Sequence, residues 1–293
     1  GGTAPLSYQW RKGGVNISGA TASSYTIASV VTSDAGSYDC VVTDACGTAT
    51  SNAATLTVNT GPSITTQPQS QTKCVGDAVT FTVTASGTAP FTYQWRKNTV
   101  NITGATASSY TIASVVIGDA ANYDCVVTNT CGSATSNAAT LTVNIGPSIT
   151  TQPLSQTIVV GNPVTFSVVA GGTAPLSYQW RKNATNITGA TASSYTIASV
   201  VVGDAGSYDC VVTNSCGSQT SDAATLTVTP ANCPGDCNCD GVINFDDINP
   251  FIDALSGATP CNFANCDIDG NGQINFDDIN PFVAILSSGT PCP

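Results

Sequence analysis

A repeat of 85 residues constrains the fold of this chain more than any other feature of its sequence. The motifs Y-Q-W-R-K and Y-D-C-V-V-T each occur three times at this spacing, marked by Tyr8, Tyr93, Tyr178, Cys40, Cys125 and Cys210. A fixed period indicates an array of one domain type. Each repeat contains short β-branched runs of alternating polarity, such as Val79 to Ala85, separated by Gly, Pro, Asn and Asp. About seven short strands in some 85 residues predict a β-sandwich.

Particular residues narrow the sandwich to one family. Trp95 occupies the position of a strand-C core tryptophan, and D-A-A-N-Y-D-C runs from Asp119 to Cys125. Tyr123, two residues before that cysteine, fits a tyrosine corner. The repeats resemble I-set immunoglobulin domains, and the resemblance covers residues 61–145 and 146–230.

The repeats depart from that family at strand B. Val83 in the second repeat and Val168 in the third stand where the strand-B cysteine belongs. The usual disulfide between the two sheets is therefore not expected. We expect Cys125 and Cys210 to be buried thiols.

Residues 1–60 form an incomplete repeat. Gly1 aligns with Ser86 and Gly171, so the segments that become strands A and B in the other repeats have no counterpart. A sandwich without two strands exposes its core and leaves an unpaired edge. Two explanations are open: this is a piece of a longer repeat protein, or a neighbouring molecule supplies the missing strands.

Two acidic twelve-residue loops near the C-terminus predict metal binding. They run from Asp236 to Asp247 and from Asp267 to Asp278, with oxygen side chains at positions 1, 3, 5, 9 and 12 and glycine at position 6. This is the spacing of an EF-hand-type loop, in which position 7 contributes its backbone carbonyl to Ca²⁺. The sequence therefore predicts two Ca²⁺ ions, with ligands Asp236, Asn238, Asp240, Val242, Asn244, Asp247, Asp267, Asp269, Asn271, Gln273, Asn275 and Asp278.

Each acidic loop leads into an apolar segment with helical spacing. In Ile248 to Leu255, apolar residues fall at i, i+3, i+4 and i+7, which predicts that Ile248, Phe251, Ile252 and Leu255 share one buried face. The segment Ile279 to Leu286 repeats the pattern. No helix is expected before either loop.

The duplicated loop–helix unit, residues 233–293, resembles a dockerin module. Dockerins bind calcium and dock onto cohesin modules, and the resemblance implies that loop positions 10 and 11 read the partner. These are Phe245, Asp246, Phe276 and Asp277, where typical dockerins carry small hydroxyl residues. Six cysteines in the module are a further departure, so the resemblance leaves two partners open: a cohesin-like module or another copy of the chain.

The 13 cysteines indicate an oxidising compartment, because such residues form disulfides in secreted and surface proteins. Their number is odd, so at least one remains a thiol or bonds to another chain. A bond from Cys74 to Cys131 would have to span one sandwich, beyond the roughly 7 Å limit between Cα atoms. A bond between Cys74 and Cys216 of the next repeat is the more reasonable expectation.

Charge and composition exclude several classes of function. The net charge is −11, all seven basic residues precede residue 183, and the terminal module contains nine Asp and no Lys or Arg. Nucleic acid is therefore not an expected partner. No apolar run of 18 residues predicts a membrane span. Since His and Glu do not occur and the Asp pairs have calcium spacing, the chain is not expected to be an enzyme.

The sequence thus predicts a mainly β chain of tandem immunoglobulin-like β-sandwiches with a small C-terminal α-helical calcium-binding dockerin-like domain. The domains are 1–60, 61–145, 146–230 and 233–293. The expected function is that of a non-catalytic extracellular or cell-surface structural protein, bacterial by its resemblance, which can form a homopolymer or filament by head-to-tail association. Two alternatives stay open: the C-terminal part of a secreted hydrolase anchored through its dockerin, and an adhesin.

Overall fold

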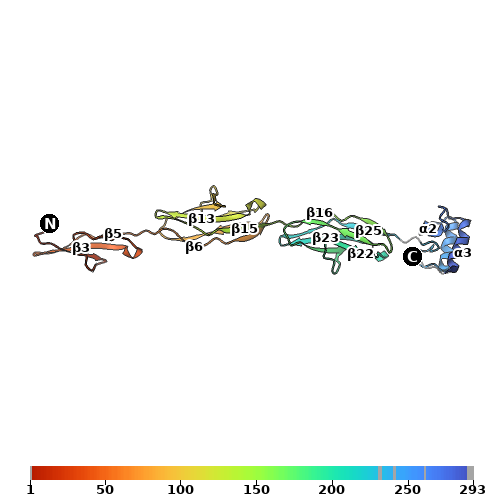
Figure 1. The fold of residues 1–293 in the computed structure, drawn as a ribbon, viewed down its shortest axis with the longest axis horizontal. Helices are drawn as coiled ribbons and strands as arrows, with labels where there is room; N and C mark the ends of the chain where they lie inside the picture. Colours follow the sequence, from red (N-terminus) through yellow and green to blue (C-terminus); the bar gives the residue numbers. More distant parts are fainter. Residues whose placement is uncertain (1, 230–232, 240–241, 261, 289–293) are drawn as a thin grey trace. The chain divides into compact units, whose positions relative to one another are not determined.

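The computed structural model describes residues 2–229, 233–239, 242–260 and 262–288 (Figure 1). The chain divides into two compact units, Gly1–Val143 and Asn144–Pro293. The expectation of a mainly β fold with tandem sandwiches and a small C-terminal helical region is confirmed. Among the described residues, no helix is both long and apolar enough to cross a membrane.

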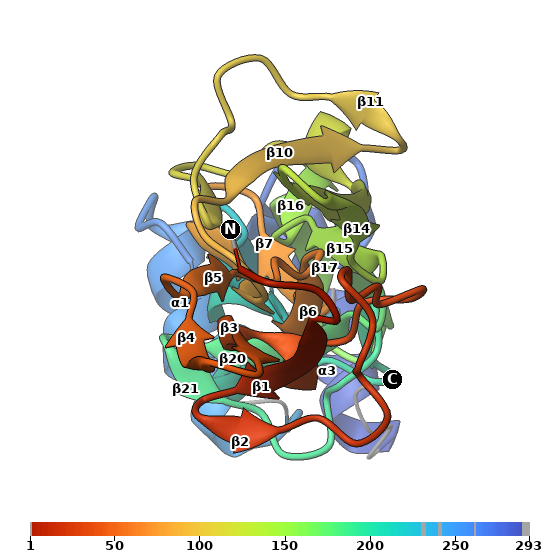
Figure 2. The same cartoon turned by 90° about the vertical axis from the view of Figure 1, so that its left-hand side faces the viewer.

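Residues 2–60 form a single sheet in the order β2-β1-β3-β4, and β5 also pairs with β3 (Figure 2). Its strands are β1 (Ser7–Lys12), β2 (Val15–Asn16), β3 (Gly36–Asp44), β4 (Gly47–Thr50) and β5 (Ala54–Leu56). Within residues 2–60 no second sheet covers this one. Trp10 is therefore only half-buried, whereas its counterpart Trp95 is 0% exposed.

The second repeat is a two-layer sandwich. One layer has the order β11-β10-β13-β15-β7 with β14 on β13, and the other contains the pairs β12–β8 and β6–β9. The strands are β6 (Ser63–Thr66), β7 (Gln71–Cys74), β8 (Val79–Thr82), β9 (Thr84–Ser86), β10 (Thr92–Lys97), β11 (Val100–Asn101), β12 (Ser109–Ile112), β13 (Ala121–Asn129), β14 (Gly132–Thr135) and β15 (Ala139–Asn144).

The third repeat has the same architecture. One layer has the order β17-β25-β23-β20-β21 with β24 on β23, and the other contains β18–β22 and β16–β19. The strands are β16 (Ser148–Thr151), β17 (Gln156–Val159), β18 (Val164–Ser167), β19 (Val169–Gly171), β20 (Ser177–Lys182), β21 (Thr185–Asn186), β22 (Ser194–Ile197), β23 (Gly206–Asn214), β24 (Gly217–Thr220) and β25 (Ala224–Thr229).

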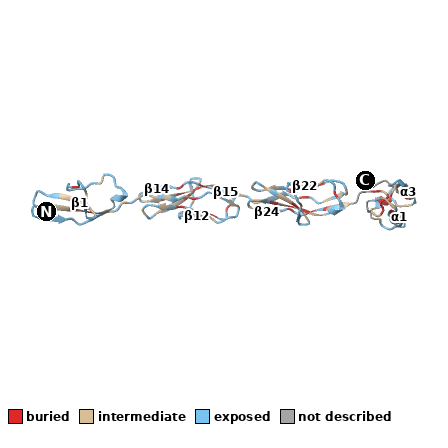
Figure 3. Ribbon diagram, turned by 90° about the horizontal axis from the view of Figure 1, so that it is seen from below, coloured by how far each residue is buried: buried red, intermediate tan, exposed pale blue. Residues whose placement is uncertain are grey.

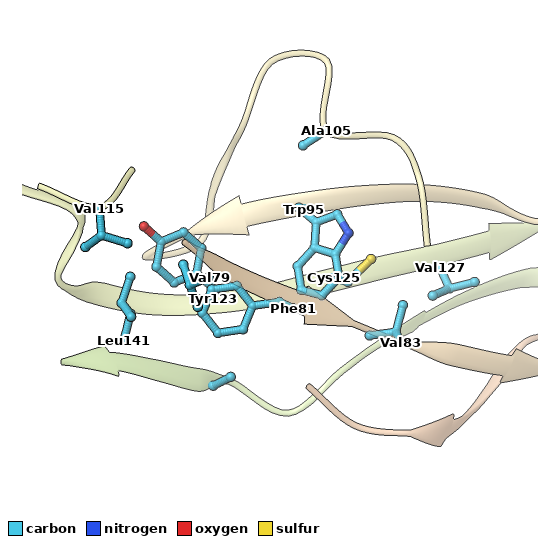
Figure 4. Close-up of a cluster of buried hydrophobic side chains, with 11 residues drawn as sticks. Val79, Phe81, Val83, Trp95, Ala105, Val115, Tyr123, Cys125, Val127 and Leu141 are labelled. Atoms are coloured by element: carbon cyan, nitrogen blue, oxygen red, sulfur yellow. The ribbon is translucent and has the colours of Figure 1, made fainter. Parts of the chain in front are cut away.

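Aromatic packing between the layers forms the core of each complete sandwich, and Figure 4 shows the core of the second repeat. In the second repeat the ring centroids of Phe81 and Tyr123 are 4.9 Å apart, and Phe81 lies 6.2 Å from Trp95. The third repeat reproduces this arrangement around Phe166 and Trp180. Colouring by burial shows buried residues inside both complete repeats and few in the strands of residues 2–60 (Figure 3).

The tyrosine corner predicted at Tyr123 is present. Its hydroxyl donates a hydrogen bond to the backbone carbonyl of Asp119 at 2.8 Å, and Tyr38 and Tyr208 repeat the contact. Burial, and next the charge of Asp119, raise the pKa of Tyr123 to about 12. The corner therefore fixes the turn that leads into β13.

The run predicted from Val79 to Ala85 is not one continuous strand. It divides at Val83 into β8, which pairs with β12, and β9, which pairs with β6. Val83 itself is buried, and its N–H donates to the carbonyl of Ser108 at 3.0 Å. A break at this point lets one run of chain serve two strand pairs in the same layer.

Each complete repeat forms hydrogen bonds with the chain segment that leads into its first strand. The carbonyl of Thr60 accepts hydrogen bonds from the N–H of Thr88 at 3.1 Å and from Asn129 Nδ2 at 2.7 Å. Thr88 also receives the Thr60 N–H on its hydroxyl at 2.9 Å. Ile145, Thr173 and Asn214 form the same contacts in the third repeat. We call each set of three residues an entry clasp.

The described residues of the C-terminal module form three short helices: α1 (Ile248–Leu255), α2 (Phe263–Cys266) and α3 (Ile279–Ser288). The two helices predicted after the loops are present. The expectation that no helix precedes either loop is wrong for the second loop, because α2 ends at the residue before Asp267. The predicted buried face of α1 is also partly wrong: Ile252 is exposed, while Ala254 is buried beside Phe251. The helix turns its Phe251–Ala254 edge toward the small core, which leaves Ile252 outside.

The cysteines separate into thiols and disulfides. Cys125 and Cys210 are fully buried thiols, as predicted from Val83 and Val168. Cys74, Cys216, Cys233 and Cys239 are disulfide-bonded. Cys131 is an exposed thiol, so it is not bonded to Cys74. The bond expected between Cys74 and Cys216 stays a prediction, and Cys261 and Cys292 lie outside the described residues.

Candidate metal centre

The second acidic loop brings three carboxylates together. One oxygen each of Asp267, Asp269 and Asp278 lies within 4.8 Å of the others. Asp267 and Asp278 are buried, and Asp269 is exposed toward solvent. Carboxylates at this spacing repel one another unless a cation lies among them. Calcium takes about 6–8 oxygen ligands and is the ion that this donor set suits.

Backbone hydrogen bonds position the two buried carboxylates. Asp278 accepts the N–H groups of Ile268 and Asp269 on Oδ1, at 2.7 and 3.1 Å, and that of Asn275 on Oδ2 at 2.9 Å. Position 12 of the loop is thereby tied to its start and to position 9. Each carboxylate has about four lone-pair positions, so these contacts leave acceptor capacity for a cation.

A tight turn completes the second loop. Asp267 accepts the N–H of Asn271 at 3.1 Å and that of Gly272 at 2.8 Å. Gly272 has φ of +85°, in the left-handed region that favours glycine. Glycine at position 6 therefore permits the sharp turn that brings the later residues of the loop back toward its start.

The first loop repeats this geometry where it is described. Asp247 is fully buried and accepts the N–H of Asn238 at 3.1 Å and that of Asn244 at 2.9 Å. Asp236 is also buried. Asp240, the ligand predicted at position 5, lies outside the described residues together with Gly241.

The predicted position-9 ligands have a second role. Asn244 Oδ1 accepts the N–H of Asp246, and Asn275 Oδ1 accepts that of Asp277, both at 2.6 Å. These contacts cap the 3₁₀ turns Phe245–Asp247 and Phe276–Asp278, which begin α1 and α3. Position 9 of an EF-hand often reaches calcium through water, so capping and ligation are compatible.

The remaining predicted ligands lie on the loop surface. Asn271 is exposed, and its Nδ2 donates to Asp269 Oδ2 at 2.7 Å. Val242 and Gln273 are exposed, as expected of residues that offer only a carbonyl. Their role as ligands stays a prediction.

A small core joins the two loop–helix units. The Phe251 and Phe282 rings stack with centroids 4.0 Å apart, and Cys237 and Cys266 are buried beside them. A hydrogen bond with the Cys266 thiol, burial, and the carboxylates of Asp247 and Asp236 raise the pKa of Cys237. Cys237 follows the first ligand of loop one, and Cys266 precedes the first ligand of loop two.

No pattern in the sequence singles out Asn265, yet this residue connects the two loops. Its side chain is fully buried and contacts the turn that enters the first loop. A lone Asn before an acidic loop has no periodic or motif signature. Only the three-dimensional structure shows that Asn265 is a polar residue buried beside an apolar core.

Two phenylalanines stand out from the module surface. Phe245 is 80% exposed and Phe276 is 82% exposed, each at position 10 of its loop. Large apolar side chains in matching exposed positions are typical of protein contact sites rather than of a core.

Comparison with known proteins supports the fold of the repeats. Residues 61–129 and 146–214 match the family model described as an immunoglobulin domain. They are immunoglobulin-like domains. The expectation drawn from the core tryptophan and tyrosine corner is therefore confirmed, and the resemblance of residues 233–293 to dockerins stays a prediction.

Several animal proteins are similar in sequence. Mouse Roundabout homolog 1 is 30% identical over 205 residues, which span 64% of this chain and 13% of that protein. Human Leucine-rich repeats and immunoglobulin-like domains protein 1 is 31% identical over 196 residues, spanning 57% of this chain and 18% of that protein. The chain thus matches less than a fifth of the length of either relative.

A solved structure shares the arrangement of strands. The I-band fragment I67–I69 of titin aligns with a TM-score of 0.58 and 22% sequence identity, covering 78% of this chain and 90% of that fragment. At this identity the likeness concerns the fold.

Proposed function

We propose that this chain is a non-catalytic, extracellular binding protein in which immunoglobulin-like repeats present a calcium-stabilised C-terminal docking module. Similarity to multidomain animal proteins with immunoglobulin-like domains supports an adhesive role over a purely structural one. The cysteine-rich composition and the disulfides support an extracellular site. The hydrolase alternative and a bacterial origin stay predictions from the sequence.

The observation that carries the proposal is the pair of exposed phenylalanines within the acidic loops. Phe245 and Phe276 stand at equivalent points of two loop–helix units, each at the start of the 3₁₀ turn that leads into the helix. Exposed aromatic residues of this kind contribute strongly to binding when a partner desolvates them. Calcium would fix the turns on which these side chains stand.

The residues present fit calcium well. All of the side-chain donors predicted for the loops are oxygens, and three carboxylates of the second loop converge within 4.8 Å. Bound calcium would offset their mutual repulsion and contribute to stability by mass action, about 2.7 kcal/mol per site at 100 times Kd.

Calorimetric titration of the full chain tests the calcium part. Two sites are expected, and Asp278→Asn should remove one of them because it weakens position 12 of the second loop. Asp253→Asn is the matched control, since Asp253 is exposed on α1 outside both loops. Fewer than two sites in the parent chain, or an equal loss in both variants, would refute it.

The docking part is tested with a second copy of the chain as the partner. Sedimentation velocity in calcium should show concentration-dependent association, and the double variant Phe245→Ser with Phe276→Ser should abolish it. Phe263→Ser, which changes a less exposed phenylalanine outside the loops, should leave association intact. A chain that stays monomeric at all concentrations would exclude self-association and turn attention to a cohesin-like partner. Filament formation is the further step that such self-association would permit.

A further inference from the structure

Asn265 stands between the two acidic loops. It belongs to α2, two residues before Asp267, and none of its surface is exposed. A buried amide has to find hydrogen-bond partners, because leaving them unpaired costs free energy. Its partners therefore show which parts of the module it connects.

Those partners lie at the entrance to the other loop. Asn265 Nδ2 donates to the backbone carbonyl of Asp236 at 2.8 Å, and Oδ1 accepts the N–H of Cys233 at 2.7 Å. The Asn265 backbone carbonyl accepts the N–H of Gly235 at 2.7 Å. One residue thus grips the whole turn from Cys233 to Asp236, which ends at the first predicted ligand of loop one.

The neighbouring cysteines make a second connection in the same place. The Cys237 thiol donates to the Asn265 carbonyl oxygen at 3.7 Å, and Cys266, the residue after Asn265, is buried in the same small core as Cys237. The first residues of the two acidic loops are therefore held by one shared set of contacts. Ordering of one loop start reduces the freedom of the other.

We infer that Asn265 is a positioning residue that couples the two proposed calcium sites, so that filling one raises the affinity of the other. The inference rests on the proposed calcium function. A first ion that orders Asp236 also orders the turn held by Asn265 and, through it, the approach to Asp267. The second ion then pays less of the ordering entropy, which gives positive cooperativity. Couplings of this kind typically change affinity by about 5–150-fold.

The first test compares calcium titrations of the full chain and of Asn265→Asp. This variant keeps the acceptor for the Cys233 N–H and loses the donor to the Asp236 carbonyl. The parent should bind its second ion at least about fivefold more tightly than its first. Asn265→Asp should still bind two ions, with that ratio reduced to about one. Asn249→Asp, an exposed change of equal charge on α1, should keep the parental ratio.

The second test does not depend on any change at Asn265. In Asp247→Asn the first loop is weakened, so calcium fills the second loop. Hydrogen exchange should then show that calcium slows exchange of the Cys233 and Gly235 amides, which lie outside the second loop and bond to Asn265.

The outcomes separate the two proposals. Absence of calcium binding by the parent chain would refute the calcium function and the coupling with it. The coupling alone would be overturned if the two sites of the parent chain bind calcium independently and with equal affinity. It would also be overturned if calcium leaves exchange of the Cys233 and Gly235 amides unchanged in Asp247→Asn.

Discussion

Trp95 and Cys125 are directly opposite each other in the antiparallel register of β10 and β13, and neither exposes any surface. The cysteine therefore packs as a small apolar side chain within the aromatic core. Burial is the main reason that the pKa of its thiol is raised to about 11. The thiolate, which is the reactive form, is accordingly scarce at neutral pH.

The first prediction concerns the reactivity of these thiols. In the folded chain at pH 8, Cys125 and Cys210 should resist alkylation, while the exposed thiols Cys46 and Cys131 react. Mass spectrometry of labelled peptides measures this, with denatured protein as the reference for full labelling. Rapid labelling of Cys125 in the folded state would contradict the prediction. It would show that the sandwich opens, or that Cys125 is not buried in its core.

The second prediction is alkaline instability linked to the tyrosine corner. The pKa of Tyr123 is raised from 10.0 to about 12 in the folded state, chiefly by burial. The native state therefore holds this proton more tightly than the unfolded state. The corresponding stability is complete below about pH 10 and is lost as pH rises through 12. Tyr208, with its pKa also raised to about 12, adds to the effect in the third repeat.

Denaturant unfolding between pH 8 and 12 measures this loss. Tyr123→Phe should flatten the pH dependence of the second repeat and lower its stability at pH 8 by about 1 kcal/mol, because the bond to Asp119 is removed. Tyr93→Phe is a control outside the corner. An unchanged pH profile in Tyr123→Phe would contradict the assignment.

The third prediction concerns Gly87, where the entering segment approaches the sandwich closely. A Cβ at this position would lie 2.5 Å from the carbonyl oxygen of Gly61, and φ is +127°. Gly87→Ala should therefore destabilise the second repeat by at least about 1–3 kcal/mol. Gly118→Ala meets no atom within 4 Å and has no positive φ, so it should be nearly neutral. Thermal unfolding of both variants decides the matter, and equal midpoints would refute the close approach.

The fourth prediction addresses the entry clasp of the second repeat. Asn129→Asp removes the donor to the carbonyls of Thr60 and Thr88 and places a negative charge beside them. The amide of Thr88, which bonds to Thr60, should exchange its hydrogen faster. Asn122→Asp adds the same charge on the exposed part of β13 and keeps its acceptor for the Thr140 hydroxyl. Similar exchange rates in the two variants would argue against a clasp.

The sequence predicted much of the fold because the decisive residues carry local signatures. The resemblance to immunoglobulin domains placed Trp95, Tyr123 and the valines that replace the strand-B cysteine, and the structure agrees on all three. Helices α1 and α3 followed from apolar periodicity. The division of the Val79 run into β8 and β9 could not be foreseen, because alternation is the same on both sides of Val83.

The site was predictable as a set of residues and less so as an arrangement. Ligand spacing predicted Asp267, Asp269 and Asp278 as ligands, and the structure brings their carboxylates together. Their binding of calcium stays a prediction. The connections through Asn265 and through the entry-clasp residue Asn129 were missed. Both depend on hydrogen bonds between segments far apart in the sequence. An isolated Asn that connects two segments has the same sequence signature as an Asn in a surface loop.

The parallel pairing of β17 with β25 has a mechanical consequence. These strands run from Gln156 beside Leu226 to Val159 beside Thr229, near the two ends of the third repeat in sequence. Tension that passes β16 along the backbone reaches this pair at the start of β17 and leaves it at the end of β25, which lie at opposite ends of a parallel pair. The load therefore shears all of their hydrogen bonds together instead of peeling them one by one. Resistance to stretching is then set by the rate of crossing one concerted barrier.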